Sequence, residues 1–299
     1  MRRGRNSCTM VPEMRRYLFV FALLGVLAAC NQIKSLTGPT PTPPPAPTSG
    51  FYYTAVGASD GIGFGGSAVC VPLAECPNGT GYVQILHRRL AASGQVTHLN
   101  LSIPGAVMSR AVEDLSNSIG RTVPGNFVER ESPYVQTSAT HVTVFAGGND
   151  VNTISIGARA KGGSDPNGFA DAQIRQWGTD LDDLIARIRA RSANTRIVAL
   201  NLPNLAASPY VSSNTVDEKR LLQRVAVGLT DRINALTSKN VLVVDLMCEP
   251  RLLLASSYAS DGFHPNDAGY AIIADLVGPS FLNGTALAPN PTCPQRTIF

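Results

Sequence analysis

The sequence lacks the patterns that indicate a metal site or a repeat architecture. Its 299 residues contain no Cys-x-x-Cys pair, and the four histidines are scattered, so the ligand spacing of a zinc site is missing. We find no internal repeat and no second linker in the part of the chain that could build a core. These absences favour one domain without a zinc site. We expect the protein to work without a metal or organic cofactor.

A run of about 20 apolar residues, the length of a membrane span, is also missing near the start of the chain. The uncharged run 17–29 follows two arginines and has the length of a secretory h-region, so we predict a signal peptide over residues 1–29. Its ending, Leu-Ala-Ala followed by Cys30, resembles the lipobox of bacterial lipoproteins. The resemblance implies that Cys30 is diacylated and becomes the first residue. Asn31 fits outer-membrane export in that family; the alternative is an ordinary cleaved signal in which Cys30 is incidental.

The net positive charge disappears with the signal peptide. The chain has 25 basic and 21 acidic residues, and residues 1–29 hold five of the former and one of the latter. The mature chain is therefore formally neutral. Because a neutral chain has no general field that attracts phosphate backbones, nucleic acid is not an expected partner.

A proline- and threonine-rich stretch separates the signal from the rest of the chain. Residues 37–50 read TGPTPTPPPAPTSG, a composition that favours extended polyproline conformations and cannot build a core. We predict that residues 30–50 are a tether that begins at the lipidated Cys30. The remainder, residues 51–299, is long enough for one well-buried domain.

Four cysteines lie in that domain, an even number in a chain bound for an oxidising compartment. Cys70 and Cys76 bracket a short loop that contains proline, whereas Cys248 follows a predicted strand and Cys293 lies in the tail. Pairing 70 with 76 and 248 with 293 needs the least rearrangement, although four cysteines allow three pairings.

Short β-branched or apolar runs alternate with helical patterns along the domain. The predicted strands are residues 52–56, 96–101, 141–145, 196–200 and 241–246. Apolar residues at helical spacing lie between the last three, at positions 181, 184, 185 and 188 and at 221, 222, 225, 229 and 233. This alternation predicts a doubly wound α/β domain, a flavodoxin-like five-stranded parallel sheet with helices on both faces.

Ligands bind beyond the carboxyl ends of the strands in such sheets, and polar residues follow the predicted strands there. The first strand leads into Gly-Ala-Ser59-Asp-Gly, the second into Gly105, and the third into Gly-Gly-Asn149-Asp. Asp261-Gly-Phe-His264 follows the last strand. Each segment alone is ordinary turn chemistry. Together they supply a serine nucleophile, a base with a carboxylate and candidate oxyanion donors, the set that acyl transfer requires.

The order Ser, Gly, Asn and Asp-x-x-His resembles the SGNH hydrolases, also called GDSL esterases and lipases, over most of residues 51–282. The resemblance implies that Ser59 is the nucleophile, His264 the general base and Asp261 the acid that orients it. The oxyanion hole would comprise the amides of Ser59 and Gly105 and the side chain of Asn149. Ala58 and Asp60 depart from the usual Gly-Asp-Ser-Leu, which leaves open whether Asp60 braces the turn, caps the next segment or faces substrate.

The resemblance implies a secreted, lipid-anchored serine esterase that cleaves small, lipid or acylated-glycan esters through an acyl-enzyme. We expect a cell-envelope location, as an outer-membrane lipoprotein facing the periplasm or the cell surface. Substrate selectivity would come from the segments 61–81, 151–168 and 203–214, which we predict as variable loops. The alternative is a ligand-binding or structural lipoprotein that retains these residues without turnover.

Overall fold

The computed structural model describes residues 50–74 and 76–297. These residues belong to one compact unit, Ser49–Phe299. The predicted signal peptide, Cys30 and nearly all of the predicted tether lie outside the described residues. No helix in the described part of the chain is both long and apolar enough to cross a membrane.

A five-stranded parallel sheet forms the centre of the unit, in the order β2-β1-β3-β4-β5. The prediction of a doubly wound sheet is confirmed. Every residue of β3 is buried, as expected for a central strand covered on both faces. The strands are β1 (Phe51–Gly57), β2 (Val96–Asn100), β3 (His141–Phe145), β4 (Arg196–Leu200) and β5 (Leu242–Val244).

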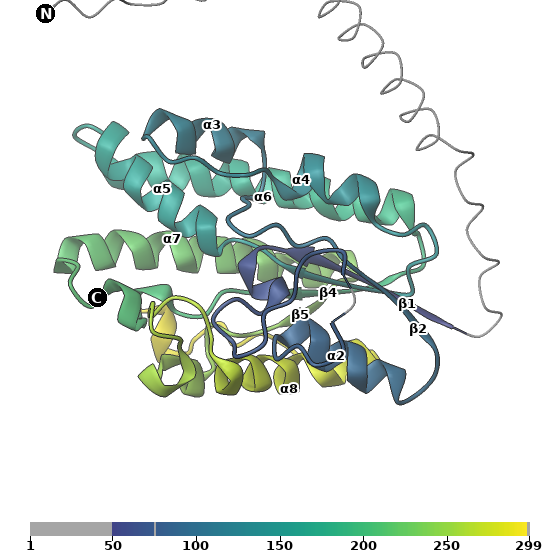
Figure 1. Cartoon of the computed structure of the whole chain (residues 1–299). Coiled ribbons are helices and arrows are strands. Elements are labelled where there is room, and N and C mark those ends of the chain that lie inside the picture. The colour runs from purple at the N-terminus through teal and green to yellow at the C-terminus, as the bar shows by residue number, and fades with distance from the viewer. Residues whose placement is uncertain (1–49, 75, 298–299) are drawn as a thin grey trace, which may run out of the picture. The chain divides into compact units, whose positions relative to one another are not determined.

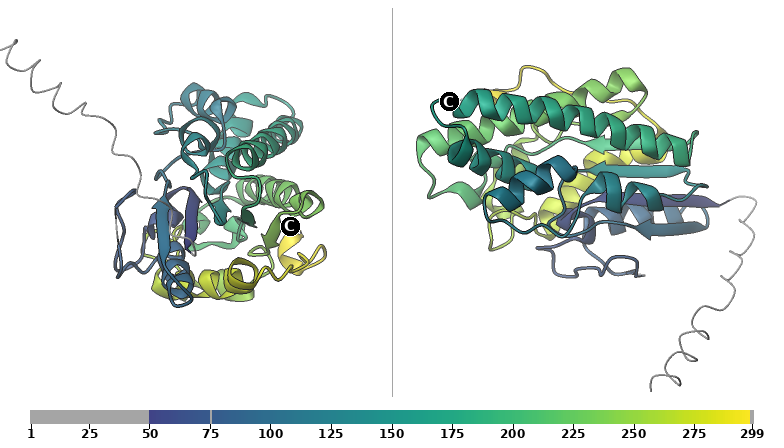
Figure 2. Two further views of the ribbon diagram at one scale, coloured as in Figure 1. Left: turned by 90° about the vertical axis from the view of Figure 1, so that its right-hand side faces the viewer. Right: turned by 90° about the horizontal axis from the view of Figure 1, so that it is seen from above.

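Helices cover both faces of the sheet. Figure 1 shows α2 and α8 below the strands and the other helices above them, and the turned views in Figure 2 agree. The helices are α2 (Tyr82–Ala91), α3 (Arg110–Ser118), α4 (Phe127–Arg130), α5 (Gly148–Lys161), α6 (Pro166–Arg191), α7 (Val216–Asn234) and α8 (Asp267–Asn283).

Local sequence explains where three of these helices begin. Asp165 accepts a hydrogen bond from the Gly168 amide at 2.8 Å, with proline at the first position of α6. Thr215 and Glu218 form a capping box at the start of α7. Asn266 caps α8 by accepting a hydrogen bond from the Gly269 amide at 3.1 Å.

The prediction of a loop over residues 151–168 is wrong, because most of this segment is helical. It contains the last eleven residues of α5 and the first turn of α6. Eight residues of α5 are buried, on more than one side, and they include polar and small residues as well as apolar ones. The helix therefore has no single apolar stripe that the sequence could reveal. The strand predicted over 241–246 is also shorter, since β5 spans only Leu242–Val244.

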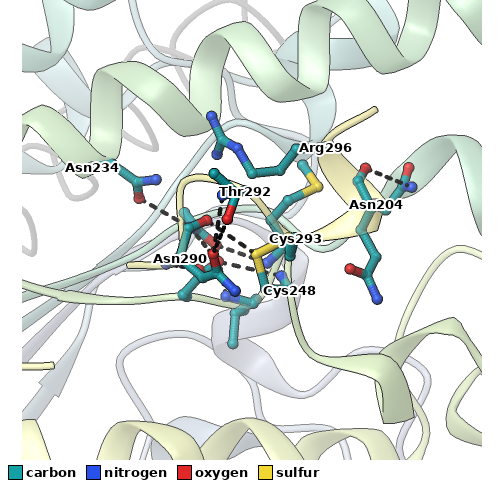
Figure 3. Close-up of a disulfide and its surroundings, with 12 residues drawn as sticks. Asn204, Asn234, Cys248, Asn290, Thr292, Cys293 and Arg296 are labelled. Atoms are coloured by element: carbon teal, nitrogen blue, oxygen red, sulfur yellow. Dashed lines mark hydrogen bonds between the residues drawn. A yellow bond between two sulfur atoms is a disulfide. The ribbon is translucent and has the colours of Figure 1, made fainter. Parts of the chain in front are cut away.

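Both predicted disulfides are present, Cys70–Cys76 and Cys248–Cys293. The second joins the loop after β5 to the C-terminal tail, and Figure 3 shows its surroundings. Asp245 accepts a hydrogen bond from the Asn290 amide of the tail at 2.8 Å. The Asn204 side chain, in the loop after β4, donates to the Gln295 carbonyl of the tail at 3.1 Å. The tail thus fastens two loops at the carboxyl end of the sheet.

Candidate active site

Ser59 lies just beyond the carboxyl end of β1, at the start of a short 3₁₀ turn, Ser59–Ile62. Its side chain is nearly buried, with 6% of the residue exposed. Ser59 Oγ lies 2.8 Å from Nε2 of His264, although 205 positions separate them in the chain. The hydroxyl is therefore within hydrogen-bond reach of a base that could accept its proton.

Asp261 holds the other side of the His264 ring. Its Oδ2 lies 2.6 Å from His264 Nδ1, and its Oδ1 accepts hydrogen bonds from the Phe263 and His264 amides at 2.9 and 3.0 Å. Burial acts to raise the pKa of Asp261, but the hydrogen bonds from His264 and Phe263 outweigh it, and the net pKa is lowered. The carboxylate is thus ionised near neutral pH and favours a proton on Nδ1, which leaves Nε2 free to accept.

The turn that presents Asp261 and His264 depends on Gly262. Its φ is +69°, and a Cβ there would lie 2.6 Å from the Tyr210 amide nitrogen. Both the left-handed backbone and the close approach favour glycine. Two phenylalanine rings then flank the imidazole, Phe64 at 4.6 Å and Phe263 at 4.9 Å between ring centroids.

Three candidate donors for an oxyanion follow three different strands, β1, β2 and β3. The amides of Ser59 and Gly105 have no acceptor in residues 50–74 and 76–297, so both are available to a ligand. Asn149, in the first turn of α5, donates one side-chain N–H to the Ala106 carbonyl at 3.0 Å. That bond ties Asn149 to the residue after Gly105 and leaves its second N–H free.

Glu131, a residue that was not predicted from the sequence, braces this arrangement. The residue is fully buried, and its carboxyl oxygens accept hydrogen bonds from the Gly57 amide at 2.9 Å and the Ile103 amide at 3.3 Å. Burial raises the pKa of Glu131 well above its ordinary value, while the two amides oppose the rise. One side chain thus links the strand end before Ser59 to the loop before Gly105. No periodicity or motif distinguishes Glu131 in the sequence.

Two further acids lie next to the site. Asp150 is fully buried, and its Oδ1 accepts from the Met108 amide at 2.8 Å; burial raises its pKa to about 7. Asp60 lines the cleft beside Ser59 and makes no side-chain hydrogen bond to another described residue. Burial raises the pKa of Asp60, and neighbouring His264 lowers it in part. The structure therefore places Asp150 in a bracing position and Asp60 toward the cleft.

A largely apolar cleft, which we call the apolar cleft, opens beside Asn149 and Phe263. Its empty volume, with the open solvent at its mouth, is ≈ 590 Å³. Its lining comprises Ala58, Asp60, Phe145, Gly147, Gly148, Asn149, Leu202, Pro203, Leu205, Leu252, Ser257, Tyr258, Phe263, Pro265 and Ile273. Leu202, Pro203 and Leu205 belong to the loop that the C-terminal tail fastens.

The other three histidines take no part in this site. His87 and His98 stack on each other in α2 and β2, with ring centroids 4.8 Å apart, and His141 begins β3. In the described residues no three His, Cys, Asp or Glu side chains are grouped so that they could hold a metal ion. The structure thus brings together Ser59, Asp261 and His264, and a hydrogen bond ties the first turn of α5, which holds Asn149, to the loop that holds Gly105.

The chain is similar to known proteins in both sequence and fold. A family model described as GDSL-like Lipase/Acylhydrolase matches residues 55–272. Among solved structures, the lipase Lip_vut3 from a goat rumen metagenome is 18% identical, with a TM-score of 0.54 over 76% of this chain and 96% of that chain. At that identity the likeness shows the fold alone. No curated protein matches this chain.

Two further solved structures are similar at lower TM-scores. Phospholipase A1 from Streptomyces albidoflavus NA297 is 18% identical, with a TM-score of 0.49 over 75% of this chain and 95% of that chain. A family 3 carbohydrate esterase from Clostridium thermocellum is 15% identical, with a TM-score of 0.47 over 78% of this chain and 95% of that chain.

Proposed function

Because this chain belongs to the GDSL-like lipase/acylhydrolase family and is thus a hydrolase of the esterase and lipase type, we propose that it cleaves carboxylic esters through an acyl-enzyme on Ser59. The observation that carries the proposal is the continuous chain of contacts from Ser59 Oγ to His264 Nε2 at 2.8 Å and from His264 Nδ1 to Asp261 Oδ2 at 2.6 Å. A serine hydroxyl is a weak nucleophile until such a base accepts its proton.

In the proposed reaction, Ser59 Oγ attacks the ester carbonyl carbon while its proton passes to His264 Nε2. The Ser59 and Gly105 amides and the free Asn149 N–H then stabilise the negative oxygen of the tetrahedral intermediate. His264 returns the proton to the departing alcohol oxygen, which leaves an ester on Ser59. A water molecule, activated by the same histidine, hydrolyses that ester. Asp261 orients the ring and stabilises the imidazolium that forms twice in the cycle.

The apolar cleft fits the acyl group of the substrate. Asn149 and Phe263 line it, so a carbonyl placed in the oxyanion hole would have its acyl substituent at the entrance. Most of the lining is aliphatic or aromatic carbon, which favours an apolar ligand. Of the two chain neighbours of Ser59 that line the apolar cleft, Ala58 is apolar and Asp60 is polar.

Labelling with a fluorophosphonate tests the proposal directly. The reagent forms a stable bond with an activated serine, so the purified wild-type chain should be labelled at Ser59 and should hydrolyse p-nitrophenyl acetate. The Ser59→Ala variant should lose both properties. A folded wild-type protein that is neither labelled nor active, yet binds ligands, would support the alternative of a lipoprotein that binds without turnover.

We also propose that the mature protein is anchored through lipid on Cys30, in the outer membrane of the cell envelope. The support is the Leu-Ala-Ala-Cys30 ending of the predicted signal and the proline-rich tether after it. One acyl chain binds membranes weakly, whereas several give stable anchoring. Cys30→Ser should therefore release the protein from membranes or leave its precursor uncleaved. An unlipidated mature N-terminus downstream of residue 30, found by intact-mass analysis of the wild type, would rule this out.

A further inference from the structure

A second cleft lies along helix α5, the helix that begins beside the candidate oxyanion hole with Asn149 in its first turn. Asn149, Asn152, Ile156 and Arg159 recur at spacings of three and four residues, so they share one helix face. From Asn149 to Arg159 this face runs for about 15 Å. The polar cleft, as we call it, lies along it with an empty volume of ≈ 640 Å³, mouth included. Its lining comprises Asn152, Ser155, Ile156, Arg159, Tyr210, Asn214, Glu218 and Leu222.

Two side chains of the polar cleft have hydrogen-bonding capacity that the protein does not use. Ser155 is 4% exposed, and its buried hydroxyl has no hydrogen-bond partner among residues 50–74 and 76–297. Asn152 is 9% exposed, and its amide forms no side-chain hydrogen bond with any described residue. A buried polar group without a partner costs about 1–3 kcal/mol, so such groups in a native protein generally meet water or a ligand.

The charges in the polar cleft favour a neutral ligand. Its cation, Arg159, forms an ion pair with Glu218, and Glu218 also caps the start of α7. The pair leaves no uncompensated positive charge to hold a phosphate or carboxylate. Tyr210 adds an aromatic ring that is 48% exposed, and its hydroxyl makes no hydrogen bond to a described residue. Hydroxyl, amide and an exposed ring suit a neutral molecule that carries several hydroxyl groups.

The polar cleft and the apolar cleft are neighbours across one pair of rings. Tyr210 of the polar cleft packs edge-on against Phe263 of the apolar cleft, with ring centroids 5.2 Å apart. The Tyr210 amide also donates to the Gly262 carbonyl at 3.1 Å, within the turn that presents His264. A substrate whose carbonyl lies at Ser59 could therefore extend into both clefts, one apolar and one polar.

We propose that the polar cleft binds the alcohol part of the substrate and that this part is a carbohydrate. Asn152 and Ser155 would hydrogen-bond its hydroxyl groups, and Tyr210 would pack against its ring. This inference rests on the proposed function of Ser59, and it assigns acylated carbohydrates as the substrate class. The two clefts then separate the acyl and alcohol halves of one ester.

Two acetate esters with different alcohols test the assignment. We would measure kcat/KM for an O-acetylated xylo-oligosaccharide and for p-nitrophenyl acetate with the wild type, Asn152→Leu and Asn117→Leu. Asn117 is an exposed residue of α3 that lines neither cleft, so it is a matched control. The ratio of the two kcat/KM values, oligosaccharide over p-nitrophenyl acetate, should fall about 3- to 10-fold in Asn152→Leu, the worth of one neutral hydrogen bond. It should keep its wild-type value in Asn117→Leu.

An unchanged ratio in a folded Asn152→Leu variant would overturn the inference. So would a variant that improves long-chain p-nitrophenyl esters without changing the ratio, because the polar cleft would then hold an acyl chain. If Asn152→Leu does not fold, Ser155→Ala makes the same test with a smaller change in volume. Wild-type labelling and p-nitrophenyl acetate hydrolysis report on Ser59 separately, so failure of the cleft and failure of the nucleophile are distinguishable.

Calorimetry with the unacylated xylo-oligosaccharide adds a readout without turnover. The affinity of the oligosaccharide should fall by the same factor in Asn152→Leu, and equal affinities for the variant and the wild type would contradict the proposal.

Discussion

Two histidines, one at each end of the parallel sheet, have partners at both ring nitrogens but differ in what those partners are. His264, at the carboxyl end, lies between the Asp261 carboxylate and the Ser59 hydroxyl. His141, at the amino end, lies between the Thr140 hydroxyl at 2.8 Å and the Arg196 guanidinium at 3.3 Å. A carboxylate stabilises an imidazolium, whereas a guanidinium opposes it.

The environment of His141 makes it a structural residue. Burial first, and then Arg196, lower its pKa to about 4, so it stays neutral near physiological pH. Arg196 in turn donates to the Phe281 and Leu282 carbonyls at the end of α8. His141 and Arg196 at the amino end thus bond each other, a hydroxyl and backbone carbonyls, whereas the Ser59 and Gly105 amides at the carboxyl end have no acceptor among the described residues. His264 differs from His141 in having a carboxylate partner, and the candidate active site differs in having backbone donors that are free to bind a ligand.

The largest expected effect comes from making the His264 partner neutral. Asp261→Asn keeps the size of the side chain but no longer favours the proton on Nδ1, so turnover should fall by about 10⁴-fold, as when a triad carboxylate is lost elsewhere. Steady-state ester hydrolysis measures the effect, and circular dichroism checks the fold. Wild-type turnover in a folded variant would remove Asp261 from the mechanism, with Asp60 as the next carboxylate to examine.

Asn149→Ala removes a free donor at the carboxyl end. Because an oxyanion donor acts on charge present only in the transition state, kcat should fall by roughly 10² to 10³ while KM changes little. A residue that served only the turn would alter stability instead. Turnover within a few-fold of wild type, in a folded Asn149→Ala protein, would contradict the oxyanion-hole assignment.

Glu131→Gln loosens the brace between the nucleophile and oxyanion loops. An amide NH₂ cannot accept a hydrogen bond, so either the Gly57 amide would lose its acceptor or the Ile103 amide would keep only its bond to the Gly57 carbonyl at 3.1 Å. Because small misplacements of reacting groups are costly, kcat should fall about 10- to 100-fold with little change in KM. Glu129→Gln makes the same chemical change at an exposed position two residues away and should leave kcat near wild type. Equal kcat values for Glu131→Gln and wild type would mean that Glu131 has no positioning role.

At the amino end, Arg196→Met should leave turnover within about two-fold of wild type. The variant loses hydrogen bonds from a charged donor to two carbonyls, so the free energy of unfolding should decrease by about 1.5–3 kcal/mol. Denaturant titration measures the loss. A large fall in kcat without a change in stability would show that the two ends of the sheet are coupled.

The smallest expected effect is on how stability depends on pH, and it compares Asp150 at the carboxyl end with His141 at the amino end. The pKa of Asp150 is raised on folding to about 7, so the folded state binds its proton more tightly, and stability is lost as pH rises from about 4 to about 7. The pKa of His141 is lowered, so its contribution is lost as pH falls from about 6.5 to about 4. Relative to wild type, Asp150→Asn should gain a few degrees in Tm between about pH 5 and pH 8, and His141→Gln should show the opposite trend. Parallel Tm curves for Asp150→Asn and wild type would contradict the Asp150 shift.

Most of the sheet could be predicted because the formation of strands and turns depends mainly on residues that are close together in the sequence. The buried run of β3 and the glycine-rich turns after β1 and β3 are local patterns, and the structure places Ser59 and Asn149 just after those strands. The disulfide pairing that needs the least rearrangement, with a short loop closed by Cys70 and Cys76, is confirmed. The catalytic roles of Ser59, Asp261 and His264 stay predictions, which the contacts between these side chains in the structure support.

The sequence by itself determined the five strands, the alternation with helices and the residues offered at the carboxyl ends, because these depend on periodicity and turn chemistry within a few positions. Only the tertiary structure decided that α5 replaces a predicted loop, that Glu131 joins two loops and that two clefts meet at Tyr210 and Phe263. Glu131 lies 74 residues from Gly57, and Tyr210 lies 53 from Phe263. Contacts at such separations arise when packed helices bring distant segments together, and no local pattern in the chain encodes them.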